Sequence, residues 1–402
     1  MVQFEDIKKA ESVLRDVVKY TPVEHSRIFS ELTGNSIYLK LENLQTTGSF
    51  KLRGAYNRLY NLTDEEKEKG VVASSAGNHA QGVAYSASML HIKSTVFMPI
   101  FTPPLKVIAT QSYGAEVRLI GNTYDDTYNE AIAFANKENR KFIHPFNDEI
   151  LIAGQGTIGL EIFKQIRDLD AVVVPIGGGG LISGIALALK SLNNKIKIIG
   201  VESEGAPSMK ISVENNKIIP LKKLDTIADG IAVKTPGNIT FSLVKKYVDE
   251  LVSVSDAEIS KAIYLLLSRS KVIAEPAGAV ALAALLSNKI NLKGKNICAI
   301  ISGGNINLSL LTQIIEKGLT DEKLLVRVSI ILPDKPGTLK DILNFIAKLE
   351  ANVQSVEEDR LDKDVPVGMA KVIIILQTLG AHHISSLEKF FKENDLKYNI
   401  IS

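Results

Sequence analysis

Residues 172–184, VVVPIGGGGLISG, join an apolar run to four consecutive glycines and then to a second apolar run. The first run is typical of a strand buried in a parallel sheet, and the residues after the glycines predict a helix. Glycines let backbone N–H groups approach an anion closely. The spacing is neither a dinucleotide fingerprint nor a Walker loop. We therefore predict a cradle for one phosphate group, with a merely flexible turn as the alternative.

Outward from this segment, short β-rich runs alternate with longer amphipathic runs up to about residue 200. The alternation predicts an α/β fold, in which helices cover both faces of parallel sheets. The pattern closes with a strand at 297–302 and a helix after Asn305. The predicted strands are 36–42, 71–75, 94–98, 116–121, 141–146, 171–177 and 196–202. The predicted helices are 4–18, 78–89, 104–113, 124–137 and 156–168.

The pattern changes after a polar hinge at residues 320–323. The remaining residues predict a βαββαβ order, which is that of a ferredoxin-like module. Its predicted elements are strand 324–332, helix 338–351, strands 352–361 and 370–378, helix 385–394 and strand 398–401. His382 and His383 lie just before the second helix, where we expect a solvated pair rather than a metal site.

Composition excludes several classes of protein. The 402 residues carry a formal net charge of +2, which lacks the basic excess of a general nucleic-acid binder. The single cysteine, Cys298, excludes a disulfide framework and lies in an apolar run, where a buried thiol is expected. No apolar stretch reaches the length of a membrane span, and no signal peptide is evident. We expect a cytoplasmic protein with no nucleic-acid or membrane partner.

Three further segments carry residues suited to chemistry. In residues 46–55, TTGSFKLRGA, Lys51 begins a predicted helix, whose positive dipole end lowers the pKa of an amine. In 74–82, SSAGNHAQG, small residues at a strand end suit an anion, with a tight turn and helix cap as the alternative. In 300–305, IISGGN, Ser302 offers a neutral hydroxyl or a helix cap. Lysine, phosphate cradle, anion turn and hydroxyl together describe a pyridoxal phosphate site.

These segments, in this order, resemble the fold type II pyridoxal phosphate enzymes, and most closely the threonine ammonia-lyases. The resemblance covers residues 1–318 and implies two parallel-sheet subdomains, the smaller one at about 50–145 inserted in the larger. Four phrases carry the narrower match: 43–51 (NLQTTGSFK), 153–157 (AGQGT), 226–233 (TIADGIAV) and 274–279 (AEPAGA).

The resemblance implies a role for each matching residue. Lys51 would hold the cofactor as a Schiff base and remove the Cα proton, with Phe50 packed beside the ring. Ser302 would face the pyridine nitrogen and leave it largely unprotonated. The cofactor phosphate is the candidate general acid for the leaving hydroxyl. The phosphate would be held by Gly177, Gly178, Gly179 and Gly180, and the substrate carboxylate by Ser75, Gly77, Asn78 and His79, with Asn78 also bonding the cofactor 3′ oxygen.

One position favours elimination over racemisation. The related serine racemases carry a second base, a serine, two positions before the asparagine of the Gly-Asn-His turn. Here that position is Ala76. Relatives also carry a cation site at positions matching Glu202, Ala206 and Ser208, whose oxygen ligands suit a monovalent or divalent ion. Ser208 replaces a carboxylate of some relatives, which weakens the divalent case.

Residues 325–402 resemble an ACT domain, a small-molecule regulatory module that pairs between chains. Asp334, Pro336 and Gly337 match its loop, and Asn352 and Val353 begin its second strand. The match implies a homodimer or homotetramer and an amino-acid effector such as L-isoleucine or L-valine, with a purely structural pairing module as the alternative.

The leading hypothesis is elimination of water and ammonia from L-threonine to give 2-oxobutanoate, with L-serine converted to pyruvate as a side activity. The alternatives within the fold are a serine dehydratase, a serine racemase and a β-replacement enzyme. From another class, an inactive amino-acid sensor stays open, although the presence of Lys51 argues against it. The direction of any regulation is left open.

Overall fold

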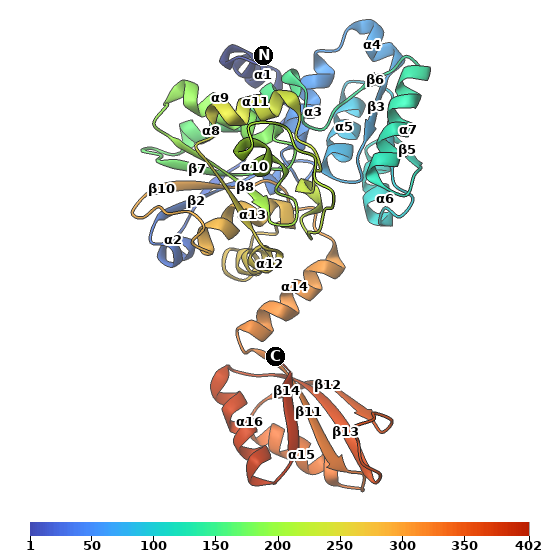
Figure 1. Cartoon of the computed structure of the whole chain (residues 1–402), viewed down its shortest axis with the longest axis vertical. Coiled ribbons are helices and arrows are strands. Elements are labelled where there is room, and N and C mark those ends of the chain that lie inside the picture. The colour runs from blue at the N-terminus through green and yellow to red at the C-terminus, as the bar shows by residue number, and fades with distance from the viewer. Residues whose placement is uncertain (402) are drawn as a thin grey trace. The chain divides into compact units, whose positions relative to one another are not determined.

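The computed structural model describes residues 1–401, in two compact units that meet between Asn307 and Leu308 (Figure 1). The sequence analysis ended the first domain at residue 318, whereas helix α14 (Leu308–Asp321) groups with the second unit. Within residues 1–401, no helix combines the length and the apolar character that a membrane span requires.

The first unit contains a six-stranded sheet in the order β1-β2-β10-β7-β8-β9, parallel except for the pair β1 and β2. The segment around the four glycines forms β7 and α9, as predicted, and Cys298 is fully buried in β10. The strands are β1 (Val23–Ser26), β2 (Ser36–Leu41), β7 (Ala171–Pro175), β8 (Lys197–Ser203), β9 (Glu250–Val254) and β10 (Asn296–Ile301).

Helices cover this sheet and contribute its apolar packing (Figure 1). They are α1 (Phe4–Leu14), α2 (Arg27–Thr33), α8 (Glu149–Gln165), α9 (Gly180–Leu192), α10 (Ser208–Glu214), α11 (Asn238–Tyr247), α12 (Asp256–Leu265) and α13 (Pro276–Leu286). Strands β1 and β9 were not predicted from the sequence. Both lie at the edges of the sheet and are only partly buried, so their sequences lack the apolar runs of the central strands.

Helix α8 corrects the predicted helix at 156–168, because it begins seven residues earlier. Asp148 caps it, since its Oδ1 accepts hydrogen bonds from the N–H groups of Ile150 and Leu151. Because glycine disfavours helices, the sequence analysis missed the start of this helix, which contains glycines. Their purpose is close packing: a Cβ on Gly156 would lie 2.9 Å from the carbonyl oxygen of Gly184 in α9.

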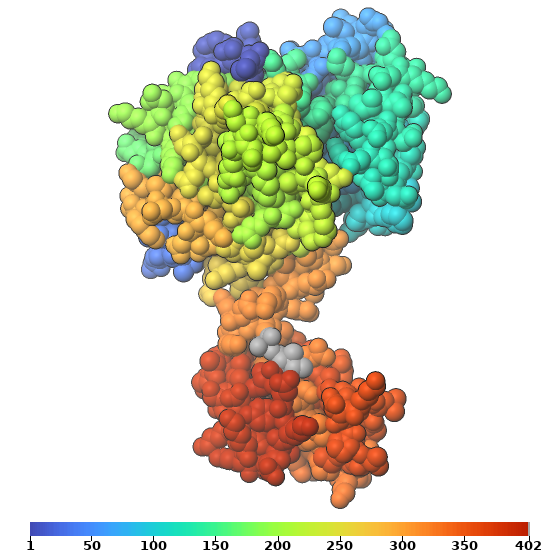
Figure 2. All heavy atoms as spheres, viewed as in Figure 1, coloured from blue at the N-terminus to red at the C-terminus, as the bar shows by residue number. Residues whose placement is uncertain are grey.

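A smaller subdomain holds a second, parallel sheet in the order β5-β4-β3-β6. Figure 2 shows its teal surface beside the yellow-green segment around residues 215–235 of the larger subdomain. Its strands are β3 (Val71–Ser74), β4 (Ser94–Met98), β5 (Glu116–Leu119) and β6 (Lys141–Phe142), and its helices are α3 (Lys51–Tyr60), α4 (Asp64–Lys69), α5 (Asn78–Met89), α6 (Pro104–Ser112) and α7 (Tyr124–Lys137).

The second unit has the predicted βαββαβ order, with an antiparallel sheet in the order β12-β13-β11-β14. The rings of Phe345 and Phe390 stack between its two helices, with centroids 3.4 Å apart. We expected His382 and His383 to be a solvated pair. This prediction is wrong for His383, which is buried, and only His382 is exposed. The elements are β11 (Leu325–Pro333), α15 (Thr338–Lys348), β12 (Asn352–Asp359), β13 (Met369–Gln377), α16 (Ala381–Glu393) and β14 (Lys397–Ile401).

Four buried charged side chains join the two subdomains. Arg53, in α3, contacts Glu42 at 2.8 Å and Glu161 of α8 at 2.6 Å, and its side chain is fully buried. Lys40 of β2 contacts the second oxygen of Glu161 at 2.5 Å. Two positive and two negative charges leave this buried charge cluster neutral. Because each charge has a partner, the cluster fixes the position of α3, which begins at Lys51.

We expect Glu161→Gln to destabilise the first unit strongly, by about 3–5 kcal/mol, because Arg53 and Lys40 then share a single buried carboxylate. Urea unfolding followed by circular dichroism measures the loss. The matched control is Glu31→Gln, which removes the exposed ion pair with Arg27 and should leave the unfolding midpoint unchanged. Equal effects of the two variants would contradict a structural role for the cluster.

Candidate functional site

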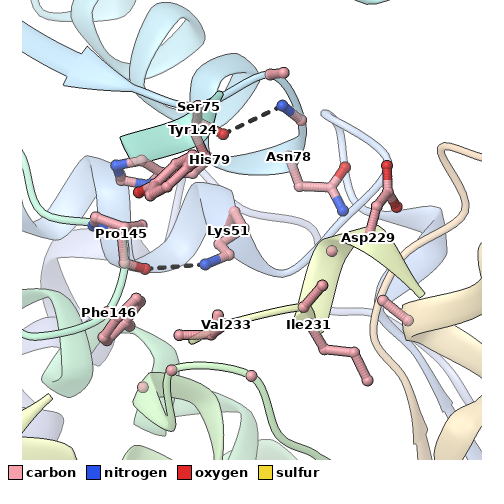
Figure 3. A pocket seen from close by; sticks show the side chains of 18 of the residues that line it. Lys51, Ser75, Asn78, His79, Tyr124, Pro145, Phe146, Asp229, Ile231 and Val233 are labelled. Carbon is pink, nitrogen blue, oxygen red and sulfur yellow. Dashed lines mark hydrogen bonds between the residues drawn. The ribbon is translucent and has the colours of Figure 1, made fainter. Parts of the chain in front are cut away.

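A cavity of about 670 Å³ lies between the two subdomains of the first unit, at the carboxyl ends of β3, β7 and β10 (Figure 3). This is the place where parallel sheets bind ligands. The tertiary structure brings together all the residues predicted to hold the cofactor and the substrate, from segments more than 200 positions apart. The lining residues include Phe50, Lys51, Ser75, Gly77, Asn78, His79, Gly177, Gly178, Gly179, Gly180 and Ser302.

Lys51 is the first residue of α3, and its Nζ donates a hydrogen bond of 2.9 Å to the carbonyl oxygen of Pro145 (Figure 3). The Nζ lies 5.3 Å from the centroid of the Phe50 ring. Burial lowers the pKa of Lys51 to about 8, and the negative charge of Glu275 opposes this shift. The lowered pKa was predicted, but from the helix dipole, whereas loss of water is the larger cause. The amine is thus partly neutral near neutral pH.

The four glycines form a rigid loop rather than a flexible turn. A Cβ on Gly177 would lie 2.9 Å from the Cα of Ile231, and one on Gly178 would lie 2.2 Å from the Phe146 ring. Gly179 has a φ of +90°, which disfavours other residues. The loop ends at the N-terminus of α9, where the first-turn N–H groups have no acceptor within the helix. This arrangement suits a phosphate group.

The turn after β3 also faces the cavity. Ser75 Oγ accepts a hydrogen bond of 3.2 Å from the N–H of Gly77, and a Cβ on Gly77 would meet no atom within 4 Å (Figure 3). The intervening Ala76 lines the cavity with a methyl group and carries no hydroxyl. This turn is therefore open on its cavity side, as an anion site requires.

The side chain of His79 is not available to a carboxylate in the cavity. Its Nε2 is 2.9 Å from the carbonyl oxygen of Ile143 and donates to it, and its buried Nδ1 has no partner. Burial and the charge of Lys51 lower the pKa of His79 to about 3, so the ring is neutral. An unprotonated Nδ1 repels a carboxylate. The group that His79 can offer to an anion is the backbone N–H at the start of α5.

Two neighbours of Asn78 were missed by the sequence analysis as site residues. Asn78 Nδ2 donates to Glu275 Oε1, and Asn78 Oδ1 accepts a hydrogen bond of 2.7 Å from Asn305. These two contacts fix the orientation of the Asn78 side-chain amide, because Nδ2 must face Glu275 and Oδ1 must face Asn305. Burial raises the pKa of Glu275 to about 7, helped by Asp229 and opposed by Asn78 and Lys51. The phrase 274–279 was noted for its resemblance, but only the fold shows that its carboxylate enters the site.

Ser302 joins the lysine segment through its backbone as well as facing the cavity. Its carbonyl oxygen accepts a hydrogen bond of 3.1 Å from the N–H of Phe50, and its Oγ lies 3.5 Å from the carbonyl oxygen of Ala277. Because the contact between Ser302 Oγ and the Ala277 carbonyl oxygen is long, the hydroxyl can still form a hydrogen bond with a ligand. The serine is buried, so its hydroxyl is shielded from bulk water.

Gln155 gives an independent test of whether pyridoxal phosphate suits the cavity. It lies in α8, is fully buried and lines the cavity, yet neither polar atom of its amide has a hydrogen-bond partner. Its Oε1 lies 2.8 Å from the Cβ position of Gly180, beside the phosphate cradle. Unpaired buried amides are costly, so the cavity is built for a polar occupant. A buried amine, a glycine cradle and this amide together fit pyridoxal phosphate.

The predicted cation ligands lie apart from these lining residues. Both carboxylate oxygens of Glu202 accept hydrogen bonds, from the N–H groups of Met209 and Lys210 at 2.9 and 2.7 Å. Burial raises the pKa of Glu202 to about 8, and Ser208 Oγ is buried without a partner. Within residues 1–401 no cluster of three or more His, Cys, Asp or Glu side chains is arranged to bind a metal ion.

Two ion pairs connect the subdomains across the mouth of the cavity. Lys106 of α6 contacts Asp229 at 2.7 Å, and Lys234 contacts Asp125 of α7 at 2.5 Å. All four residues line the cavity. The sequence offered no signal for these pairs, because their partners are more than 100 positions apart.

Comparisons with known proteins agree with this geometry. A model of the pyridoxal-phosphate-dependent enzyme family matches residues 14–303. An L-threonine ammonia-lyase of Thermotoga maritima is 49% identical over 97% of each chain. The solved threonine deaminase isoform 2 of Solanum lycopersicum is 40% identical, with a TM-score of 0.75 over 78% of this chain and 92% of its own. Maize serine racemase is 35% identical, with a TM-score of 0.75 over 80% and 98%.

We expect Glu275→Gln to lower the pKa of Lys51 below about 8, because the anion that favours the ammonium form is removed. The pH dependence of Lys51 acylation in the cofactor-free protein, followed by peptide mass spectrometry, gives the midpoint. Glu204→Gln, at an exposed carboxylate paired with Lys289, is the matched control. A midpoint that stays in place or rises in Glu275→Gln would refute the electrostatic link.

Proposed function

The chain belongs to the pyridoxal-phosphate-dependent enzymes, and we propose that within this family it is an L-threonine ammonia-lyase that also accepts L-serine. The observation that carries this proposal is the buried, partly neutral amine of Lys51 in the same cavity as the phosphate cradle of residues 177–180. Similarity to the Thermotoga maritima enzyme over almost the whole chain supports the choice of substrate.

Pyridoxal phosphate, held through Lys51, supplies an electron-withdrawing ring next to the substrate Cα. Lys51, released as a free amine when the substrate binds, would take the Cα proton, and its lowered pKa leaves a fraction of neutral amine for this task. Asn78 directs an N–H group toward the cofactor 3′ oxygen, because Asn305 and Glu275 fix its amide. Ser302 offers the ring nitrogen a neutral hydroxyl.

The turn at Ser75 and Gly77 binds the substrate carboxylate through its N–H groups and the hydroxyl, together with the backbone N–H groups of Asn78 and His79. Ala76 supplies no second proton donor, so a proton removed from Cα is not replaced on the opposite face. Elimination is therefore favoured over racemisation, and the hydroxyl would leave from Cβ as water, with the cofactor phosphate as the candidate proton donor.

For the second unit we propose a regulatory role, in which an amino acid such as L-isoleucine or L-valine binds where two copies pair in a homodimer or homotetramer. Gly337, with a φ of +99°, is the N-cap of α15, and Asp334, three residues earlier in the same loop, forms a 2.9 Å ion pair with Arg360. Pro336 lies in the same loop, and Asn352 and Val353 begin β12. We place the enzyme in the cytoplasm.

The purified protein should release 2-oxobutanoate from L-threonine and, more slowly, pyruvate from L-serine, measured by a coupled 2-oxo acid assay. Lys51→Ala should lose the yellow colour of the bound cofactor and at least about 1,000-fold in turnover, because it lacks both the anchor and the base. Its circular dichroism spectrum should match the wild type. A folded Lys51→Ala variant that still turns over L-threonine would contradict the assignment of Lys51 as anchor and base.

Addition of L-isoleucine should change the KM for L-threonine by about 5- to 150-fold, which is the usual range of an allosteric coupling. Asp334→Asn should reduce this response while leaving turnover without effector unchanged. An enzyme indifferent to L-isoleucine and L-valine would leave the catalytic proposal intact but remove the regulatory one.

A further inference from the structure

His144 lies in the cavity wall, in the turn between β6 and α8. Its ring packs edge-on against Phe146, with centroids 4.6 Å apart, and also contacts Tyr128. The sequence analysis did not single it out, and nothing in the roles described above uses its side chain. The sequence analysis placed His144 inside a predicted strand, 141–146, where its ring would lie on a face of the sheet. Strand β6 instead ends at Phe142, before His144.

Hydrogen bonds fix the tautomer of this imidazole. His144 Nδ1 accepts bonds of 3.2 and 2.9 Å from the N–H groups of Phe146 and Asn147. An atom that accepts two N–H bonds carries no proton. Burial and the charge of Lys51 lower the pKa of His144 to about 4, while Asp148 opposes the shift. The ring is therefore neutral, with its one proton on Nε2.

The Nε2–H group has no acceptor among residues 1–401. Every hydrogen bond of the ring is made by Nδ1, while Nε2 belongs to a ring that lines the cavity. The ring is only partly buried, so this N–H is free to donate to water in the cavity or to a bound occupant. The same turn contacts the reacting amine, because Lys51 Nζ bonds the carbonyl oxygen of Pro145, the next residue.

The other polar groups of a bound substrate already have partners. The carboxylate is received at Ser75 and Gly77, and the phosphate of the cofactor at residues 177–180. His79 is excluded as a side-chain donor, because its Nε2–H is bound to Ile143, the residue before His144. The β-hydroxyl of a hydroxy amino acid has one expected partner, the cofactor phosphate as its acid, and its oxygen keeps a second lone pair for which none of these groups supplies a donor.

We propose that the Nε2–H of His144 donates a hydrogen bond to the β-hydroxyl of the substrate and so selects β-hydroxy amino acids. This inference rests on the proposed function. The proton stays on Nε2 throughout, since a neutral imidazole is a poor acid, and His144 orients the C–O bond rather than protonating it. His144 is thus a specificity-determining residue for the leaving group.

The variant His144→Asn tests the position of this donor. Its Oδ1 replaces Nδ1 as acceptor for the two backbone N–H groups, in the manner of an Asx turn, while its Nδ2 lies near the ring Cδ2 position and does not reach the position of Nε2. We expect kcat/KM for L-serine to fall about tenfold or more, the loss of one hydrogen bond, and kcat/KM for β-chloro-L-alanine to change less than about twofold. Both substrates give pyruvate, but chloride is a poor acceptor.

The complementary variant is His144→Gln, which retains a donor near Nε2 and loses the Nδ1 acceptor. It should preserve the wild-type ratio of L-serine to β-chloro-L-alanine turnover even where stability falls. Equal losses for both substrates in His144→Asn, or no loss for either, would overturn the proposal. A wild-type enzyme that eliminates chloride but not hydroxyl would overturn the proposed function itself and with it the hydroxyl partner.

A measurement independent of turnover addresses the tautomer. Long-range ¹H–¹⁵N correlation spectra of the cofactor-free protein, labelled at its six histidines, should show His144 as the neutral Nε2–H form from pH 8 to about pH 5. His144→Asn identifies the resonance by its absence. An Nδ1–H tautomer, or a ring protonated at pH 7, would contradict the assigned donor.

Discussion

The buried contact of Arg53 with Glu42 and Glu161 holds the whole site in place. Arg53 stands two residues after Lys51 in the same helix, so its two carboxylate partners fix the first turn of α3 against β2 and α8. A buried charge without a partner is expensive, so the helix cannot rotate or slide without exposing the cluster to that cost. The orientation of the reacting amine follows from this constraint.

Burial disfavours the charged form of both basic residues of α3, Lys51 and Arg53, but their pKa values shift in opposite directions. Arg53 stays charged because two carboxylates contact it directly. Lys51 contacts a carbonyl oxygen instead, and its nearest anionic influence, Glu275, bonds Asn78 rather than the amine. Its pKa therefore falls to about 8. One helix thus keeps a structural cation charged and the cavity amine partly neutral, because a guanidinium is the more basic group and Arg53 also has two carboxylates in contact.

Around the amine, the cavity is formed by groups that the protein itself leaves unsatisfied. The amide of Gln155, the N–H of His144 and the open turn at Gly77 all face a space that no side chain fills. The glycines of residues 177–180 are rigid, since their neighbours occupy every Cβ position. Such a site is preorganised, because the polar groups are fixed by packing before any ligand arrives.

The sequence by itself determined the fold class, the buried central strands and the βαββαβ order of the second unit, and through the resemblance it picked out residues that line the cavity. These are local signals: apolar runs, glycine repeats and motifs at a strand end. Tertiary structure alone decided that the Glu275 carboxylate enters the site and that burial lowers the pKa of Lys51. It also decided which ring nitrogen of His79 and of His144 carries the proton, and at which residue α8 begins. Glu275 meets Asn78 across nearly 200 residues, and a histidine's tautomer depends on the atoms around it, so neither is written in a local pattern.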